Sequence, residues 1–160
     1  MSKKSKSEAK PAGPATIQNR RARYDYEIMD TWEAGIALVG SEVKSVYLGR
    51  VNLTDAFCRI LGGEAWLISA DIEPYDKAAH FAPERRRDRK LLLHRREIDV
   101  IERKSQEKGF SILPLKVYFK NGKVKVEIGL GRGKRQYDKR EQLAEKDSRR
   151  EKERARSMRI

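Results

Sequence analysis

Apolar side chains recur at every second position in three segments of the chain, which is the period of half-buried β-strands. The first segment covers residues 24–38. The second covers residues 57–68, where Gly62-Gly63 predicts a hairpin turn. The third covers residues 113–130, where Asn121-Gly122 separates two alternating strands and gives the clearest hairpin signal. The pattern therefore predicts a mainly β, antiparallel domain.

Two segments change to a helical period. We expect the first helix to begin with Ser41 as its N-cap and to end at Gly49. The second begins at His94 and ends near Gly109, and an exposed connection without regular structure precedes it at residues 75–90. Because closure removes unpaired sheet edges, the expected fold is a small OB-like barrel of about five or six strands, with two or three short flanking helices.

Few apolar residues occur at either end of the chain. Residues 1–16 are predicted to be a disordered basic arm, and residues 134–160 a basic tail that is disordered when free and helical against an anionic surface. The domain between them spans residues 17–133. We expect one domain and a monomer. The chain contains no apolar run long enough for a bilayer, so we expect a cytoplasmic protein without a membrane partner.

The positive charge is localised. The net charge is +13, of which residues 1–16 contribute +3, the segment from Arg85 to Arg96 contributes +6 and residues 130–160 contribute +6. The rest of the chain carries a net charge of −2. Basic charge confined to tails and one internal segment is typical of nucleic-acid binding.

Signals for catalysis or metal binding are weak. Asp71, Glu73 and Asp76 are interrupted by a proline, and His80 and His94 show no ligand spacing. The glycine-rich segment 129–134 lacks the spacing of a phosphate loop, so we interpret its glycines as the release of a strand into the tail. Cys58 is expected to be a buried, reduced thiol. We therefore expect no enzyme, metal or cofactor.

Two basic segments favour RNA binding. Arg20, Arg21 and Arg23 adjoin Tyr24, which suits phosphate contacts combined with base stacking. Arg89 and Lys90 lead directly into three leucines, of which at least two are expected to fill the core.

Five short motifs occur in an order that resembles the SmpB family of bacterial SsrA-binding proteins. They are Asn19-Arg20-Arg21-Ala22, Glu33-Ala34-Gly35-Ile36, Gly40-Ser41-Glu42-Val43-Lys44-Ser45, Arg89-Lys90-Leu91-Leu92-Leu93-His94 and Asp138-Lys139-Arg140. The resemblance implies an OB-type RNA-binding adaptor. Such a protein holds the tRNA-like part of transfer-messenger RNA (tmRNA) and brings it to ribosomes stalled without a stop codon. Its C-terminal tail enters the empty mRNA channel.

The resemblance also implies site residues. By motif, the RNA-facing positions are Asn19, Glu33, Lys44 and Leu92. A carboxylate beside phosphate is unfavourable, so we expect Glu33 either to accept hydrogen bonds from base edges or to orient an arginine. Asp138, Lys139 and Arg140 match the segment that meets the decoding centre and its rRNA. The tail residues implied to contact the ribosome or its mRNA channel are Lys134, Arg135, Tyr137, Asp138, Lys139 and Arg140.

Two other functions stay open from the sequence. One is a general OB-type ribosomal or structured-RNA-binding protein. Selective capture of a tRNA-like fold over random single strands would distinguish the tmRNA adaptor from it. The other is a metal-dependent phosphate-processing enzyme, which hydrolysis on added divalent metal would reveal.

Overall fold

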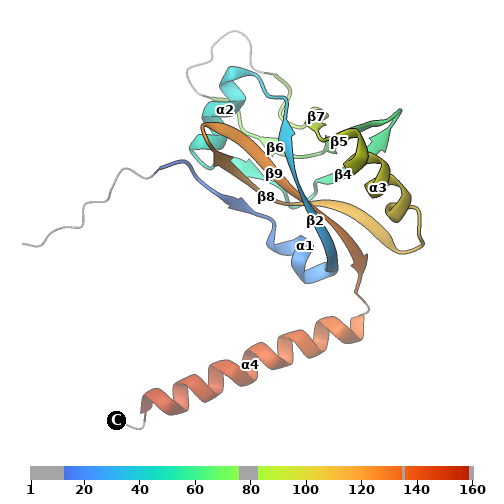
Figure 1. Cartoon of the computed structure of the whole chain (residues 1–160). Helices are drawn as coiled ribbons and strands as arrows, with labels where there is room; N and C mark the ends of the chain where they lie inside the picture. Colours follow the sequence, from blue (N-terminus) through green and yellow to red (C-terminus); the bar gives the residue numbers. More distant parts are fainter. Residues whose placement is uncertain (1–12, 76–82, 135, 159–160) are drawn as a thin grey trace, which may run out of the picture.

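The computed structural model describes residues 13–75, 83–134 and 136–158. As expected, it is mainly β: an antiparallel sheet of seven strands that nearly closes into a ring (Figure 1). β9 pairs with both β2 and β8, which brings the strand order back near its start. The order is β1 (Ile17–Gln18), β8 (Phe110–Lys120), β4 (Phe57–Leu61), β5 (Glu64–Ile68), β7 (Arg89–Leu92), β2 (Tyr26–Ile36) and β9 (Lys123–Gly133). Two further strands, β3 (Val51–Asn52) and β6 (Asp71–Ile72), form a separate pair.

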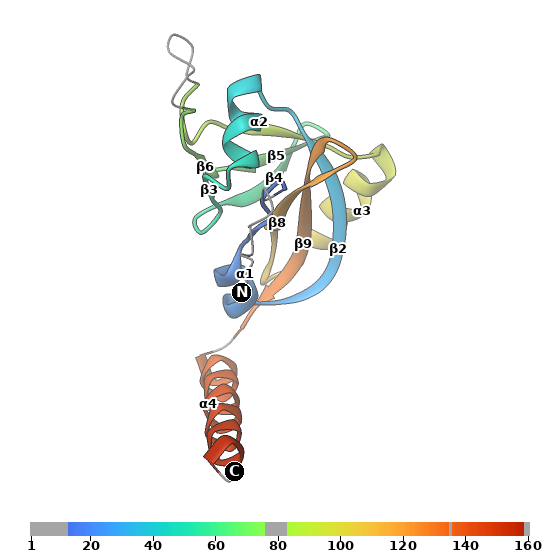
Figure 2. The same ribbon diagram turned by 90° about the vertical axis from the view of Figure 1, so that its left-hand side faces the viewer.

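Four helices occur within the described ranges, more than the expected two or three. They are α1 (Arg20–Asp25), α2 (Gly40–Tyr47), α3 (Arg95–Ser105) and α4 (Gln136–Met158). Figures 1 and 2 show α1, α2 and α3 beside the sheet and α4 projecting away from it. The body and the C-terminal helix are therefore arranged as separate parts of the molecule.

Both predicted hairpins are confirmed. Gly62 and Gly63 join β4 to β5 with φ angles of 59° and 77°, and Asn121 and Gly122 join β8 to β9 with φ angles of 52° and 75°. Positive φ at both central positions gives a turn whose twist matches that of the strands. The two turns thus set the register of both hairpins.

The sequence suggested that the glycines at residues 129–134 release a strand into the tail. The structure differs, because these glycines help to form the end of β9. Gly129 and Gly131 lie inside β9, which continues to Gly133 in register with β2. A Cβ atom at Gly129 would lie 2.7 Å from Leu115 Cδ1, and one at Gly131 would lie 2.9 Å from Tyr26 Cβ. Glycine is therefore needed here because the neighbouring side chains cross the strand at close range.

Local differences from the sequence prediction occur at element ends. Tyr24 belongs to α1 rather than to the following strand, and Val39 rather than Ser41 is the N-cap of α2. His94 is the N-cap of α3, as expected, but the contact that caps the helix comes from Glu97, whose carboxylate accepts the backbone N–H of His94 at 3.0 Å. A carboxylate three residues inside a helix satisfies an N-terminal N–H that the helix itself leaves unpaired.

The core lies inside the ring. Ala34, Leu67, Leu91, Val126 and Ile128 are among its fully buried residues. The leucine triplet divides as expected, because Leu91 is buried and Leu93 packs on the core whereas Leu92 is 53% exposed. Cys58 is a buried free thiol, and burial raises its pKa.

The C-terminal segment is helical, whereas the sequence favoured disorder in the free protein. α4 is 23 residues long, and the side chains described within it, at residues 144–155, are all exposed. Its helical form therefore rests on local terms such as glutamate–arginine pairs four residues apart, each contributing about 0.2–0.5 kcal/mol. Residues 1–12 of the predicted arm lie outside the described ranges.

Candidate nucleic-acid interface

A polar surface covers the outside of three neighbouring strands. Side chains of β2, β8 and β9 alternate between the core and this surface, which we call the outer face. Its members are Glu33 of β2, Lys116, Tyr118 and Lys120 of β8, and Lys125 and Glu127 of β9. Four of these six side chains carry a cation or a phenol, which suits contacts with phosphates and bases.

Glu33 is the centre of the outer face. The Tyr118 hydroxyl donates a short hydrogen bond to Glu33 Oε2, and Lys120 Nζ lies 3.2 Å from Glu33 Oε1. These hydrogen bonds lower the pKa of Glu33. Partial burial, followed by the bond to Glu33, raises the pKa of Tyr118 to about 12. The carboxylate is thus ionised at neutral pH, and it orients a phenol and an ammonium rather than the expected arginine.

α1 joins the outer face through Arg23. The Arg23 guanidinium lies 3.4 Å from Glu127 Oε2, and Glu127 is the direct cross-strand partner of Glu33. The fold therefore brings together two predicted motifs, Asn-Arg-Arg and Glu-Ala-Gly, that lie apart in the sequence.

Leu92 lies at the other end of the same surface. It is paired with Gly35 across β7 and β2, and a Cβ atom at Gly35 would lie 3.3 Å from Leu92 Cβ. The two residues line an open pocket of about 400 Å³ that also includes Val43, Lys123 and Lys125. An exposed leucine beside two lysines offers an apolar surface for a base and charge for its phosphate.

Asn19 is placed differently from the sequence prediction. It is 4% exposed. Its Oδ1 accepts the N–H of Ala22, and its Nδ2 donates to the carbonyls of Leu53 and Pro114 at 3.1 and 2.9 Å. Every hydrogen-bonding position of the amide is used inside the protein. Asn19 therefore caps α1 and fixes it to the sheet, which positions the arginines that follow.

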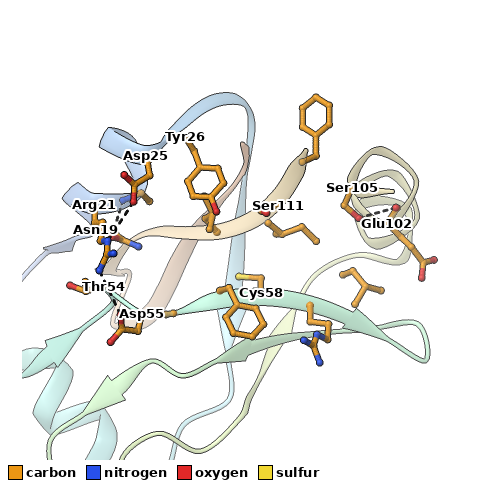
Figure 3. Close-up of a pocket in the computed structure, with 18 of the residues that line it drawn as sticks. Asn19, Arg21, Asp25, Tyr26, Thr54, Asp55, Cys58, Glu102, Ser105 and Ser111 are labelled. Carbon is orange, nitrogen blue, oxygen red and sulfur yellow. Dashed lines mark hydrogen bonds and ion pairs between the residues drawn. The ribbon is translucent and has the colours of Figure 1, made fainter. Parts of the chain in front are cut away.

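Those arginines differ in how far they are neutralised. Arg21 lies between Asp25 and Asp55, at 3.4 and 3.8 Å (Figure 3). Arg20 is exposed and has no ion-pair partner among the described residues. Arg23 has one carboxylate partner, Glu127, so Arg20 is the least neutralised of the three arginines.

The pocket drawn in Figure 3 has a volume of about 690 Å³ and lies between α1, β4, α3 and β8. Here the sheet is least closed, because β4 and β8 share the single pair Cys58 and Ile112. Asp25, Asp55 and Glu102 line it. Arg21 and Arg59 also line it, so its cations do not outnumber its carboxylates, and it suits phosphate less well than the outer face does.

Arg89 does not face the solvent, contrary to its predicted RNA contact. Its side chain is 0% exposed, and Nη2 and Nε lie 2.7 and 2.9 Å from Glu42 Oε2. It also donates to the carbonyls of Ala70, Arg85 and Arg87. Arg87 contacts the other oxygen of Glu42 at 2.5 Å. Burial alone would raise the pKa of Glu42, but the hydrogen bonds from Arg87 and Arg89 outweigh it and lower that pKa.

This Glu42–Arg87–Arg89 cluster joins α2 to the basic segment before β7. Two further predicted cations have other partners. Lys90 is half-buried, on the same side of β7 as Leu92, and its Nζ lies 2.6 Å from Glu64. Lys44 is exposed on α2, with its Nζ 5.3 Å from the centre of the Tyr75 ring.

The predicted tail contacts are less completely described. Lys134 Nζ donates to the carbonyl of Arg23, so it lies against α1. Arg135 lies outside the described residues, whereas Tyr137, Asp138, Lys139 and Arg140 belong to the first turns of α4. Their side chains are not described.

Sequence reasoning missed Tyr118, Lys120 and Lys125. The alternation in residues 113–130 carries the signal, because the positions between its core residues must face outward. Within the described ranges, no His, Cys, Asp and Glu side chains gather as metal ligands, and no helix there has the length and apolar character to cross a bilayer. Of the predicted acidic group, Asp71 pairs with Arg85, and Asp76 lies outside the described residues.

Comparison with known proteins identifies the family of the chain. The family model described as SmpB protein matches residues 16–158. An SsrA-binding protein of Thermobifida fusca is 51% identical over 97% of this chain and 97% of its own length. One of Carboxydothermus hydrogenoformans is 52% identical over 86% of this chain and 93% of its own length.

A solved structure described as "tmRNA-SmpB: a journey to the center of the bacterial ribosome" superposes with a TM-score of 0.66 at 46% identity. The superposition covers 80% of this chain and 94% of that one. Because sequence, family model and structure agree over most of the chain, the chain belongs to the SmpB family of SsrA-binding proteins.

Proposed function

We propose that the protein is an RNA-binding adaptor that holds the tRNA-like part of tmRNA and delivers it to stalled ribosomes in the cytoplasm for trans-translation. The observation that carries the proposal is the outer face, where Arg23, which directly follows the Asn-Arg-Arg-Ala motif, lies on the same side of the sheet as Glu33 and Leu92 of two other motifs. No catalytic group is needed for this role. Holding RNA requires shape, phosphate contacts and stacking.

The proposed RNA site contains the exposed members of the predicted set together with the cations of the outer face. Arg20, Arg23 and Lys125 contact phosphates, and Leu92 contacts a base. Glu33 keeps Tyr118 and Lys120 in place for bases that enter beside them. Asn19 and Arg89 act beneath the surface. In this proposal, the nearly closed sheet is an OB-type barrel, whose strands and loops are a common platform for nucleic acids.

The tail has a separate role in the proposal. α4 projects from the body, and its charged side chains within residues 144–155 are exposed, which suits entry into a narrow channel lined by rRNA (Figure 2). Once α4 occupies the mRNA channel, the residues from Tyr137 to Arg140 lie near the decoding centre. The tail thus tests whether a message is present while the body holds the tmRNA.

Truncation after Lys134 tests this division. The body keeps its core, so the unfolding temperature and the affinity for tmRNA should stay nearly unchanged, apart from a modest loss of long-range attraction. Protein tagging on stalled ribosomes should collapse. Normal tagging would exclude the role of the tail, and affinity reduced to the level of unrelated RNA would assign the tail to the tmRNA site.

A further inference from the structure

The fold pairs most cations of the basic segment Arg85–Arg96 with carboxylates from other parts of the chain. Six of the seven cations in this segment have such a partner. The pairs are Arg85 with Asp71, Arg86 with Asp55, Arg87 and Arg89 with Glu42, Lys90 with Glu64, and Arg95 with Asp99. All five carboxylates lie outside the segment in the sequence. The local charge of +6 therefore overstates the positive charge that this segment presents to an RNA.

Two adjacent arginines of the segment remain within reach of a ligand. The side chains of Arg85 and Arg86 are each 52% exposed, whereas Arg89 is buried and Arg87 is held by the buried Glu42. An exposed ion pair contributes little to folding, because water can replace either partner. The pairs made by Arg85 and Arg86 therefore matter less for folding than for the charge available to phosphates.

Asp71 holds Arg85 in the geometry that an arginine uses to bind phosphate. Nε and Nη2 of Arg85 donate to the two carboxylate oxygens of Asp71, at 2.9 and 3.2 Å. Two parallel hydrogen bonds of this kind are how a guanidinium recognises either a carboxylate or a phosphate. Asp71 thus occupies the donors that a phosphate would need, and its charge repels a phosphate that approaches them.

Asp55 lies in the turn between β3 and β4, between two arginines from different motifs. Its Oδ1 is 3.8 Å from Nη1 of Arg21, and its Oδ2 is 3.8 Å from Nη2 of Arg86 (Figure 3). At these distances the contacts are charge interactions rather than hydrogen bonds. One aspartate therefore lowers the positive potential of both α1 and the basic segment.

Arg85 lies beside β6 rather than on the three strands of the outer face. Its backbone carbonyl accepts the N–H of Ile72 in β6 at 3.1 Å. Figure 2 shows β6 and β2, the strand that carries Glu33, on opposite sides of the body. A free cation at this place would bind the phosphates of any RNA, because phosphate contacts carry no sequence information. Such binding would compete with the orientation that the outer face imposes.

We propose that Asp55 and Asp71 are specificity-determining residues, which withhold Arg86 and Arg85 from phosphates and so limit binding to RNA of any fold. This inference rests on the proposed function and deepens it, because it assigns residues that weaken unwanted binding. Selectivity is a difference between two affinities, so removing general phosphate contacts raises it just as adding specific contacts does. With these cations neutralised, the outer face decides which RNA the protein holds.

The test measures affinity and its salt dependence for two RNAs of equal length, the tRNA-like part of tmRNA and a fully paired duplex. The full-length variant Asp55→Asn/Asp71→Asn keeps the shape of both side chains and frees two cations. On the duplex, the slope of log affinity against log salt should steepen by about 1.4–1.8. The gain in duplex affinity should then be about 7- to 12-fold larger in about 50 mM salt than in about 200 mM salt. Affinity for the tRNA-like RNA should change much less, because the outer face fixes its orientation.

Control variants separate freed cations from net charge and from folding. Glu107 is exposed, and no cation in the described parts of the chain pairs with it. Glu107→Gln therefore changes the net charge by the same unit as either aspartate substitution but should leave the salt slope unchanged. Asp71→Asn/Arg85→Gln removes both members of one pair and should restore the wild-type slope. If Asp71→Asn lowers the unfolding temperature, Asp55→Asn alone, at a side chain that is 59% exposed, should still steepen the duplex slope by about 0.7–0.9.

Any of four results would overturn the inference. They are an unchanged duplex slope in the folded aspartate variants, an equal effect of Glu107→Gln, a steepened slope that persists in Asp71→Asn/Arg85→Gln, and an equal gain in affinity for both RNAs. The last result would place the freed cations inside the tmRNA site. The proposed function fails on a different result, in which the wild-type protein itself does not prefer the tRNA-like RNA to the duplex.

Discussion

Glu33 and Glu42 are both glutamates held by the side chains of two donor residues, yet they are placed for opposite purposes. The carboxylate of Glu33 is 36% exposed on the outer face, where Tyr118 and Lys120 hold it. The carboxylate of Glu42 is 3% exposed beneath α2, where Arg87 and Arg89 hold it. The same chemistry therefore serves ligand recognition at one site and the arrangement of the fold at the other, and solvent exposure decides which.

The physical difference is the cost of losing a partner. An exposed ion pair exchanges its partner for water, and its contribution to stability is about 0–1 kcal/mol. A buried charge has no water to replace a lost partner, and removing one member costs about 3–5 kcal/mol. Substitutions at Glu42 should therefore change folding, whereas those at Glu33 should change RNA binding.

The largest effect is expected at the buried cluster. Glu42→Leu leaves Arg89 buried without its carboxylate and should lower the free energy of unfolding by about 3–5 kcal/mol, measured by urea denaturation. The double variant Glu42→Leu/Arg89→Met should be more stable than Glu42→Leu alone. The half-buried pair Glu64 and Lys90, which keeps access to water, is a matched control, and Glu64→Leu should cost less than about 1 kcal/mol. Equal losses at the two glutamates would refute the role of burial.

A smaller effect, on a different observable, is expected for Glu33→Gln. The free energy of unfolding should stay close to that of the wild type, because the carboxylate is exposed. Affinity for the tRNA-like RNA should fall about 10- to 100-fold, because Tyr118 and Lys120 are no longer held by an ionised partner. Glu64→Gln should leave RNA binding unchanged. Should Glu33→Gln unfold the protein while its residual folded fraction binds RNA normally, Glu33 would instead belong to the structural group.

The pH dependence of folding sharpens the same comparison. The pKa of Glu42 lies below its ordinary value of 4.5, so the stability it supplies is complete above that value and is lost as the pH falls through the lower folded-state pKa. Measured by urea denaturation between pH 6 and the acid transition, Glu42→Gln should flatten the fall in unfolding free energy. Glu33→Gln should flatten it much less, because its carboxylate faces solvent. An identical acid profile for Glu42→Gln and wild type would contradict the assignment.

The smallest effect is expected at single exposed cations of α1. Arg20→Ala should change stability by no more than about 0.5 kcal/mol and reduce the salt slope of RNA binding by about 0.7–0.9. Arg21→Ala should reduce that slope less, because Asp25 and Asp55 already neutralise Arg21. Replacing Arg20, Arg21 and Arg23 together should give the largest change in slope. A triple variant with wild-type affinity and slope would remove α1 from the interface.

The sequence predicted the strands and turns that depend on local signals. Asn121-Gly122 and Gly62-Gly63 need only their own backbone angles, and both hairpins formed as expected. The short α1 escaped prediction because six residues carry no helical period, and its start depends on Asn19 reaching Leu53 and Pro114. Contacts between residues distant in the chain leave no local pattern.

The sequence indicated which motifs belong to the candidate site, but not which of their side chains are buried and which are exposed. Arg89 and Lys90 are adjacent cations in the sequence, yet one is fully buried and the other half-buried, because they point to opposite sides of β7. Without the register of β7, neither the burial of Arg89 nor its pairing with Glu42 follows from the sequence. The outer-face residues Tyr118 and Lys120 likewise become visible only once β8 and β2 are placed on the same sheet.

The pairing of β2 with β9 has a consequence for how the protein folds during its synthesis. Tyr26 lies opposite Gly133, so the two strands come from opposite ends of the domain sequence. During synthesis, β2 has no β9 beside it until nearly the whole body has left the ribosome, and the sheet stays open for most of that time. Contacts so distant in sequence also slow refolding, because the loop between them must be ordered first. The sheet of the body therefore closes only after its last strand has been made.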